Sequence, residues 1–382
     1  MAMPAPLARR EKGPHELPKR HRFHALCPYF AMFPESFAEI WISRLTRPGD
    51  IVIDPFCGRG TLPFQALLMG RKAVGSDINP VAYCVSRAKT CAPPKASLLR
   101  RLTSLEKIYN PEPFERQRTK LPEFFRYAYR PSTLRQILFL REQLDYKRSD
   151  TDCMLAALVL GSLHGESEHS PTYLSNQMPH TISTKPAYSV RFWKERGLSA
   201  PNRDAFALLR DRIIFRYESP RPSGRATVMQ LDIRDLPRTI DLLPEPIRHV
   251  ITSPPYLDVT SYEEDQWLRL WFLGNPPHPT YDKISRDDRH EKPDDYWGLI
   301  ADMWRSLGII LAERAHIVIR LGAVRIKPKR LLDMLEGSSS FARRRVKLVA
   351  HGLSAIERRQ TDSFRPGSHG CKVEIDCHFA MA

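Results

Sequence analysis

The segment Ile51-Val52-Ile53 constrains the fold of this chain most strongly. Three consecutive apolar, β-branched residues are typical of a strand that is buried on both faces of a parallel sheet. A glycine-rich turn, a helix pattern over 62–69 and a strand pattern over 72–77 follow, and together they make one βαβ unit. Strand patterns return near 226–231, 249–252, 315–319, 346–351 and 372–380. We therefore predict an α/β fold with a doubly wound, mostly parallel, seven-stranded Rossmann-like sheet.

A long segment, 91–220, interrupts this alternation of strands and helices. Strand patterns are nearly absent from it, and helix patterns lie near 97–109, 131–145, 152–165 and 203–217. We predict that 91–220 is a large helical insertion and that 21–90 and 221–382 form one α/β domain. Residues 1–20 are rich in Pro, Arg, Lys and Glu without periodicity, which predicts a flexible basic arm.

The net charge favours a polyanionic partner. The chain carries 59 Lys and Arg against 43 Asp and Glu, and the formal net charge of +16 exceeds what solubility requires. Nucleic acid is the commonest partner of such a chain. The alternative is a protein that is merely basic.

Cysteine use and hydropathy bear on the compartment. Seven cysteines without a disulfide-framework spacing fit a reducing environment. No apolar run approaches the roughly 18 residues that a membrane span needs, and no apolar stretch near the N-terminus could serve a signal peptide. We therefore expect a soluble, cytoplasmic protein. Two Cys and two His lie within 369–378, but the alternation from Val373 to Phe379 predicts a strand there and not a metal site.

The first chemical motif is the loop from Asp54 to Thr61, between a buried strand and a helix. Gly58 and Gly60 let the backbone pass close to a ligand and turn into the helix. A dinucleotide site would have the longer Gly-x-Gly-x-x-Gly spacing. The carboxylate of Asp54 suits a cationic ligand and would repel a pyrophosphate. The alternative is an ordinary turn between strand and helix.

The second motif places Asp77 at the end of the next strand. A carboxylate in this position can accept hydrogen bonds from both hydroxyls of a ribose. The two motifs together predict a nucleoside-containing ligand at the carboxyl ends of the strands. Alternatively, Asp77 caps the helix that follows Asn79-Pro80.

The third motif, Thr252-Ser253-Pro254-Pro255-Tyr256, directly follows the apolar strand near 249–252. Two prolines fix the backbone and remove its donors, so that its carbonyls stay free to accept hydrogen bonds. The side chain of Ser253 and the carbonyl of Pro254 could hold the two hydrogens of an aromatic amine, and Tyr256 could stack on an extruded base. The alternative is a proline turn without a ligand.

The combination of DPFCGRGT, SDINP and TSPPY resembles the amino-methyltransferases that act on cytosine N4 or adenine N6 in DNA. The Ser-Pro-Pro-Tyr form resembles the cytosine N4 branch. Residues His24 to Pro34 are similar to the segment that helps to cover the methionine end of the cofactor, and Asp232 matches an acidic position that contacts the cofactor adenine. Here the insertion falls between the second and third strands, which leaves the place of the target-recognition region open.

This resemblance implies S-adenosyl-L-methionine as cofactor and no metal. The implied cofactor-binding residues are Asp54, Phe56, Gly58, Gly60, Thr61, Asp77, Ile78 and Asp232, and the implied catalytic residues are Ser253, Pro254, Pro255 and Tyr256. The expected reaction is in-line methyl transfer to the N4 of a flipped cytosine in duplex DNA.

Other functions stay open. They are adenine N6 methylation, methylation of an RNA base and, in a different class, a nucleic-acid binder without catalysis. The resemblance also implies a prokaryotic or phage-infected cell, with a restriction endonuclease or other defence-system subunit as partner.

The insertion has the composition of a DNA reader, since it mixes Lys and Arg with aromatic residues. A second basic cluster, which includes Arg325, Lys327 and Lys329, follows the strand pattern near 315–319. The candidate nucleic-acid-binding residues are Arg126, Arg130, Arg135, Lys185, Arg191, Lys194, Arg325 and Lys327. Alternatively, these helices are basic only toward solvent and pack their aromatics inward.

Overall fold

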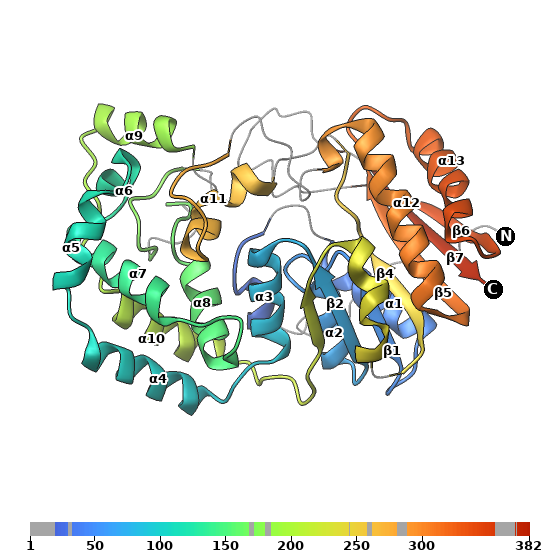
Figure 1. Cartoon of the computed structure of the whole chain (residues 1–382), viewed down its shortest axis with the longest axis horizontal. Helices are drawn as coiled ribbons and strands as arrows, with labels where there is room; N and C mark the ends of the chain where they lie inside the picture. Colours follow the sequence, from blue (N-terminus) through green and yellow to red (C-terminus); the bar gives the residue numbers. More distant parts are fainter. Residues whose placement is uncertain are drawn as a thin grey trace, which may run out of the picture.

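The protein is built around one seven-stranded sheet (Figure 1). The computed structural model describes residues 20–29, 33–167, 172–179, 185–243, 245–257, 262–280, 289–355, 371 and 373–382. The predicted basic arm therefore lies outside the described residues, apart from Arg20. The strands are β1 (Ile51–Asp54), β2 (Lys72–Asp77), β3 (Thr227–Gln230), β4 (Ile247–Thr252), β5 (Leu311–Gly322), β6 (Val346–Ala355) and β7 (Val373–Met381).

The strand order is β3-β2-β1-β4-β5-β7-β6. All pairings are parallel except those of β7, which runs antiparallel to both β5 and β6. The predicted α/β fold with a mostly parallel seven-stranded sheet is thus confirmed. The order departs from that of a dinucleotide-binding fold, because β7 is inserted between β5 and β6.

Helices cover both faces of the sheet. Successive side chains of a strand point to opposite faces, so Val52 packs with α1 (Glu35–Leu45) and α2 (Thr61–Leu68), together with Ile251 and Val318. Ile51 and Ile53 point the other way, into the core formed with α12 (Pro293–Ile310) and α13 (Pro328–Ser338). This two-sided burial explains why β1 is apolar at consecutive positions.

Residues 91–220 hold only helices and one isolated β-bridge among the residues described. The helices are α4 (Lys95–Ile108), α5 (Glu112–Thr119), α6 (Glu123–Ala128), α7 (Pro131–Gln143), α8 (Asp150–Leu160), α9 (Pro186–Glu195) and α10 (Ala205–Arg216). They gather on one side of the molecule, away from β5 to β7 (Figure 1). Their core continues into α3 (Pro80–Thr90), where the thiols of Cys84 and Cys153 each donate to the other's carbonyl.

Helix α11 (Tyr262–Phe272) belongs to the chain between β4 and β5 but packs with the insertion. The rings of Phe125 and Trp271 lie 4.5 Å apart, and Nε of Arg269 donates to the carbonyl of Leu160 at 3.1 Å. Short 3₁₀ helices complete the structure: η1 (Arg22–Ala25), η2 (Ile233–Leu242), η3 (Arg289–Glu291) and η4 (Ser339–Ala342).

The tail predicted as a strand is β7. Ile375, Cys377 and Phe379 are buried as the alternation predicted, but Asp376 between them is buried as well, because it pairs with Arg320. Within the described residues, no group of three or more His, Cys, Asp or Glu could hold a metal ion. None of the helices in that part of the chain is long and apolar enough to cross a membrane.

Candidate active site

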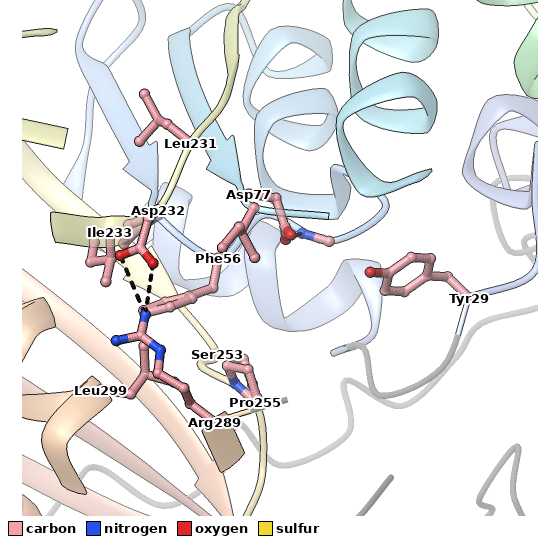
Figure 2. A pocket seen from close by; sticks show the side chains of 13 residues that line it. Tyr29, Phe56, Asp77, Leu231, Asp232, Ile233, Ser253, Pro255, Arg289 and Leu299 are labelled. Atoms are coloured by element: carbon pink, nitrogen blue, oxygen red, sulfur yellow. Dashed lines mark hydrogen bonds and ion pairs between the residues drawn. The ribbon is translucent and has the colours of Figure 1, made fainter. Parts of the chain in front are cut away.

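A pocket opens where β1, β2, β3 and β4 end at their carboxyl edge (Figure 2). It draws residues from all three sequence motifs. The lining residues are Tyr29, Pro55, Phe56, Gly58, Asp77, Ile78, Leu231, Asp232, Ile233, Ser253, Pro255, Arg289 and Leu299. Seven of the predicted site residues are among them, and Asp54, Gly60, Thr61, Pro254 and Tyr256 stand outside this lining.

The glycine-rich loop is shaped by its two glycines. Gly58 (φ 48°) and Gly60 (φ 71°) adopt the left-handed backbone region that side chains rarely tolerate. A Cβ on Gly60 would lie 2.7 Å from Oγ and 2.9 Å from Cα of Ser86. Gly60 therefore lets the loop rest on α3, while Gly58 presents bare backbone to the pocket beside Tyr29.

Asp77 joins the loop to the pocket. Its Oδ2 accepts from the backbone N–H of Gly58 at 2.8 Å, and its Oδ1 accepts from that of Asn79 at 3.0 Å. The cap of α3 is Asn79, whose side chain accepts from the N–H of Val81. Burial raises the pKa of the Asp77 carboxyl to about 6. The carboxylate keeps lone pairs toward the pocket, where hydroxyl donors could meet it.

Asp54 is fully buried and only half satisfied. Its Oδ1 accepts from the hydroxyl of Thr252 at 2.6 Å and from the N–H of Phe56 at 3.1 Å. Its buried Oδ2 has no hydrogen-bond partner among the residues that the structure describes. Burial raises the pKa of this carboxyl to about 7. A buried carboxylate oxygen without a hydrogen-bond donor lowers the stability of the fold. A bound donor, and a cation most of all, would offset this cost.

Asp232 lies at the far end of the pocket, between two guanidinium groups. Arg234 donates to it at 3.0 and 3.1 Å, and Nη2 of Arg289 lies 3.2 Å from Oδ2 (Figure 2). Burial alone would raise the pKa of Asp232, but Arg234 and Arg289 hold it below its ordinary value. Arg289 also pairs with Asp302 at 3.1 Å. No sequence signal pointed to Arg289, which reaches the pocket from a 3₁₀ helix 57 residues beyond Asp232.

The third motif begins at Thr252, the last residue of β4. The Thr252 hydroxyl donates to Asp54 and so links the third motif to the first. Ser253 and Pro255 line the pocket. Tyr256 is buried, and its hydroxyl donates to Oε1 of Glu374 at 2.6 Å. The stacking role for Tyr256 stays a prediction, and in this structure its ring packs against Gly322.

The predicted nucleic-acid-binding residues fall into two groups. Lys185, Arg191, Lys194, Arg325 and Lys327 are exposed, as is Arg126 with 68% of its side chain accessible. Arg130 is also exposed, but its Nε donates to the carbonyl of Ala200 at 2.8 Å, and the half-buried Arg135 pairs with Glu115 at 2.9 Å. These two guanidiniums hold the insertion together.

The aromatic residues of the same segment mostly point inward. Phe124, Phe125 and Tyr129 are buried. Tyr127 instead carries Arg126 and Lys194 over its ring, with charge-to-centroid distances of 5.4 and 4.9 Å. The alternative in which the aromatics pack inward therefore describes most of them. Beside Tyr127, the exposed Arg126 and Lys194 share the carboxylate of Glu123 at 3.4 and 2.8 Å.

Comparisons with known proteins identify relatives. The profile of the N6/N4 DNA methylase family matches residues 8–86. The chain is 36% identical over 66 residues to the type II methyltransferase M.MjaII of Methanocaldococcus jannaschii (17% of this chain, 12% of that protein). It is 46% identical over 54 residues to the orphan methyltransferase M.BamHII of Bacillus amyloliquefaciens (14% and 20%). It is also 42% identical over 52 residues to the type II methyltransferase M.HpaI of Haemophilus parainfluenzae (14% and 17%).

These matches cover a fifth or less of the length of the curated relatives. Among solved structures, the rRNA methyltransferase aviRa from Streptomyces viridochromogenes aligns with a TM-score of 0.33 and 15% identity. That alignment covers 92% of this chain and 87% of the other.

Proposed function

We propose that this chain is a DNA amino-methyltransferase, the family that residues 8–86 resemble, and that it methylates an exocyclic amino group of a base in DNA. The methyl donor is S-adenosyl-L-methionine, and the target is the N4 of cytosine. The observation that carries the proposal is the hydrogen bond between Thr252 and Asp54, which couples the cofactor loop to the Ser-Pro-Pro-Tyr segment beside one pocket.

The residues present fit this cofactor. Asp54 lies outside the pocket lining, and we assign its buried Oδ2, which has no hydrogen-bond partner among the described residues, as an acceptor for the methionine ammonium. Asp77, which does line the pocket, offers a carboxylate for the ribose hydroxyls. We assign Asp232, whose oxygens also accept from Arg234 and Arg289, as an acceptor for the adenine amino group, and bare backbone at Gly58 as the place where the ligand comes close. Gly60 and Thr61 shape the loop behind, and Phe56 and Ile78 supply apolar surface. The bound cofactor supplies a sulfonium methyl that transfers without a strong base.

The amine is held by the third motif. The Ser253 side chain and the Pro254 carbonyl accept its two hydrogens, which aims the nitrogen lone pair at the methyl group. Pro255 fixes the segment and removes a donor. Serine at position 253 favours cytosine N4 over adenine N6, for which the resembling enzymes carry Asp.

DNA is the proposed polyanion. The exposed cations around Tyr127 and those at Arg325 and Lys327 can contact phosphates. The base must leave the duplex to reach a pocket at the strand ends. A restriction endonuclease as partner and a cytoplasmic location belong to this proposal.

Two further functions are tested with it: adenine N6 methylation and RNA base methylation. DNA and RNA exposed to the protein with isotope-labelled cofactor would be digested to nucleosides and identified by mass. N4-methylcytosine supports the proposal, N6-methyladenine selects the other amine, and label in RNA alone changes the substrate. Cofactor binding without any labelled nucleoside would indicate a binder without catalysis. Ser253→Ala is the matched control, because it should bind cofactor normally and transfer on the order of 100-fold more slowly.

A further inference from the structure

We propose that Glu374 is a positioning residue for methyl transfer, which holds Tyr256 by its hydroxyl and thereby fixes the Ser253–Tyr256 segment at the rim of the pocket. This inference rests on the proposed function. It deepens that function by assigning a role to a carboxylate on β7, more than a hundred residues beyond the motif that it serves.

The contact has the geometry of a charge-assisted hydrogen bond. The Tyr256 hydroxyl lies 2.6 Å from Oε1 of Glu374, within the range for O–H donating to a carboxylate. The second oxygen of Glu374 lies 3.1 Å from Nη1 of Arg320. Because Arg320 has only donors, Glu374 faces it as an acceptor, and the tyrosine hydroxyl must be the donor.

A rigid buried network stands behind Glu374. Arg320 is 6% exposed and binds both oxygens of Asp376 at 2.7 Å, in a bidentate pair. Ser354 on β6 donates to Asp376 at 2.9 Å, and the ring of Phe37 lies 4.0 Å from the Arg320 guanidinium carbon. The guanidinium of Arg320 is therefore buried and bound to carboxylates within the sheet, and it is not part of a DNA-facing surface. The network ties three neighbouring strands to the carboxylate that Tyr256 contacts.

The sheet also leaves room for the tyrosine ring. Gly322 pairs with Glu374 across β5 and β7. A Cβ at Gly322 would lie 2.7 Å from Cε2 of Tyr256, so only glycine allows this approach. A bridge between Leu257 and Ala323 fixes the next residue of the segment to the end of β5. Tyr256 is thus held through its ring, its hydroxyl and the backbone that follows.

The consequence concerns the two residues that line the pocket. Ser253 and Pro255 lie within three residues of Tyr256, so their position depends on how firmly that ring is held. Methyl transfer needs the amine nitrogen in line with the methyl group, and a small misplacement of its acceptors slows the reaction. The cofactor residues come from β1, β2 and the chain after β3, so loosening Tyr256 should spare cofactor binding.

The test uses the full chain with Tyr256→Phe, Glu374→Ala, the double variant and Glu374→Gln. Tyr256→Phe keeps the ring and removes only the hydroxyl. Tyr217→Phe is the matched control, because it removes a hydroxyl that donates to the carbonyl of Pro93 at 2.7 Å, away from the pocket. The readouts are the single-turnover methylation rate, S-adenosylmethionine affinity by calorimetry, and amide exchange of a peptide that contains residues 253–257.

We expect Tyr256→Phe and Glu374→Ala each to slow transfer by roughly 10-fold or more with cofactor affinity unchanged. The double variant should be no slower than the slower single variant, because the hydrogen bond between Tyr256 and Glu374 is already lost in each single variant. Glu374→Gln, which keeps an acceptor, should recover part of the rate. Exchange in 253–257 should rise in these variants and not in Tyr217→Phe.

A wild-type rate for Tyr256→Phe, or additive losses in the double variant, would overturn the role of Glu374. Unchanged exchange would overturn it independently of activity. If the wild-type protein transfers no methyl group at all, the proposed function fails while the exchange result still decides whether Glu374 holds the segment.

Discussion

Replacing Asp54 by Asn should stabilise the cofactor-free protein at alkaline pH and weaken its response to cofactor. In the folded protein burial raises the pKa of Asp54 to about 7, from an ordinary value of 3.8. Between pH 3.8 and pH 7, the Asp54 carboxyl therefore binds a proton more tightly in the folded protein than in the unfolded chain. The protonated carboxyl contributes its full share to the free energy of unfolding below about pH 4, and this contribution is lost as the pH rises through about 7.

The size of the effect follows from that difference. Three pKa units correspond to as much as about 4 kcal/mol of free energy of unfolding at pH 8. Asn keeps an oxygen for the donors Thr252 and Phe56 and carries no charge. Asp54→Asn should therefore be more stable than wild type at pH 8, and the difference should shrink toward pH 5. Saturating cofactor should then stabilise wild type more than the variant, because its ammonium compensates the Asp54 oxygen.

Chemical denaturation at pH 5 and pH 8, with and without S-adenosylmethionine, measures these differences. Asp211→Asn on α10 is the matched control, since it makes the same change of side chain at an exposed position. A less stable Asp54→Asn protein at pH 8 would refute the reasoning, because it would mean that the buried Oδ2 is not an uncompensated charge.

Three other predictions concern cofactor, DNA and core. Asp77→Ala removes the acceptor of the Gly58 N–H as well as that of the ribose, so S-adenosylmethionine affinity should fall roughly 10- to 100-fold in calorimetry; unchanged affinity in a folded variant would remove Asp77 from the site. Replacing the exposed Arg126, Lys185 and Arg191 by Ala should flatten the slope of log DNA affinity against log salt by roughly 2 to 3. If replacing Arg325, Lys327 and Lys329 flattens it instead, DNA lies against that other surface. Lys89 is fully buried with no hydrogen-bond partner for Nζ, and burial, then Arg59, holds its pKa well below 10.5. The unfolded chain binds that proton more tightly, so folding is penalised at pH 7 and relieved as the pH rises toward about 10.4. Lys89→Met should accordingly raise the free energy of unfolding at pH 7 by about 1 kcal/mol or more, by a margin that narrows at pH 10; a loss of stability at pH 7 would contradict this.

The sheet and the pocket were predictable for one physical reason. Apolar runs specify buried parallel strands, and the carboxyl ends of such strands meet at one edge, so Asp54, Asp77 and Ser253 had to lie near each other. The strand alternation of β7 was equally visible, because the period of two shows in Ile375 and Cys377.

The parts that the sequence did not predict are set by tertiary contacts. Arg289 enters the pocket because Asp232 and Asp302 attract it, and neither pairing leaves a pattern in the sequence. Counting Lys and Arg could not show that the exposed Arg130 donates to the carbonyl of Ala200, or that Arg126 and Lys194 share the carboxylate of Glu123. Tyr256 looked free to stack, because its partner Glu374 is far along the chain.

Helix α11 packs onto the insertion, and this contact determines which segments of the protein could be exchanged with those of a relative. Residues 91–220 join the α/β domain at two points of the chain, but helix α11, from between β4 and β5, packs with them, and its Trp267 and Trp271 complete their core. An exchange of this segment with that of a relative would leave two tryptophans without a hydrophobic partner and the Leu160 carbonyl without Arg269. A chimaera cut only at the two chain boundaries should therefore misfold, whereas one that also carries α11 keeps the interface intact. In evolutionary terms the core of the insertion and α11 should change together, so that substitutions in two separate stretches of the gene should be coupled.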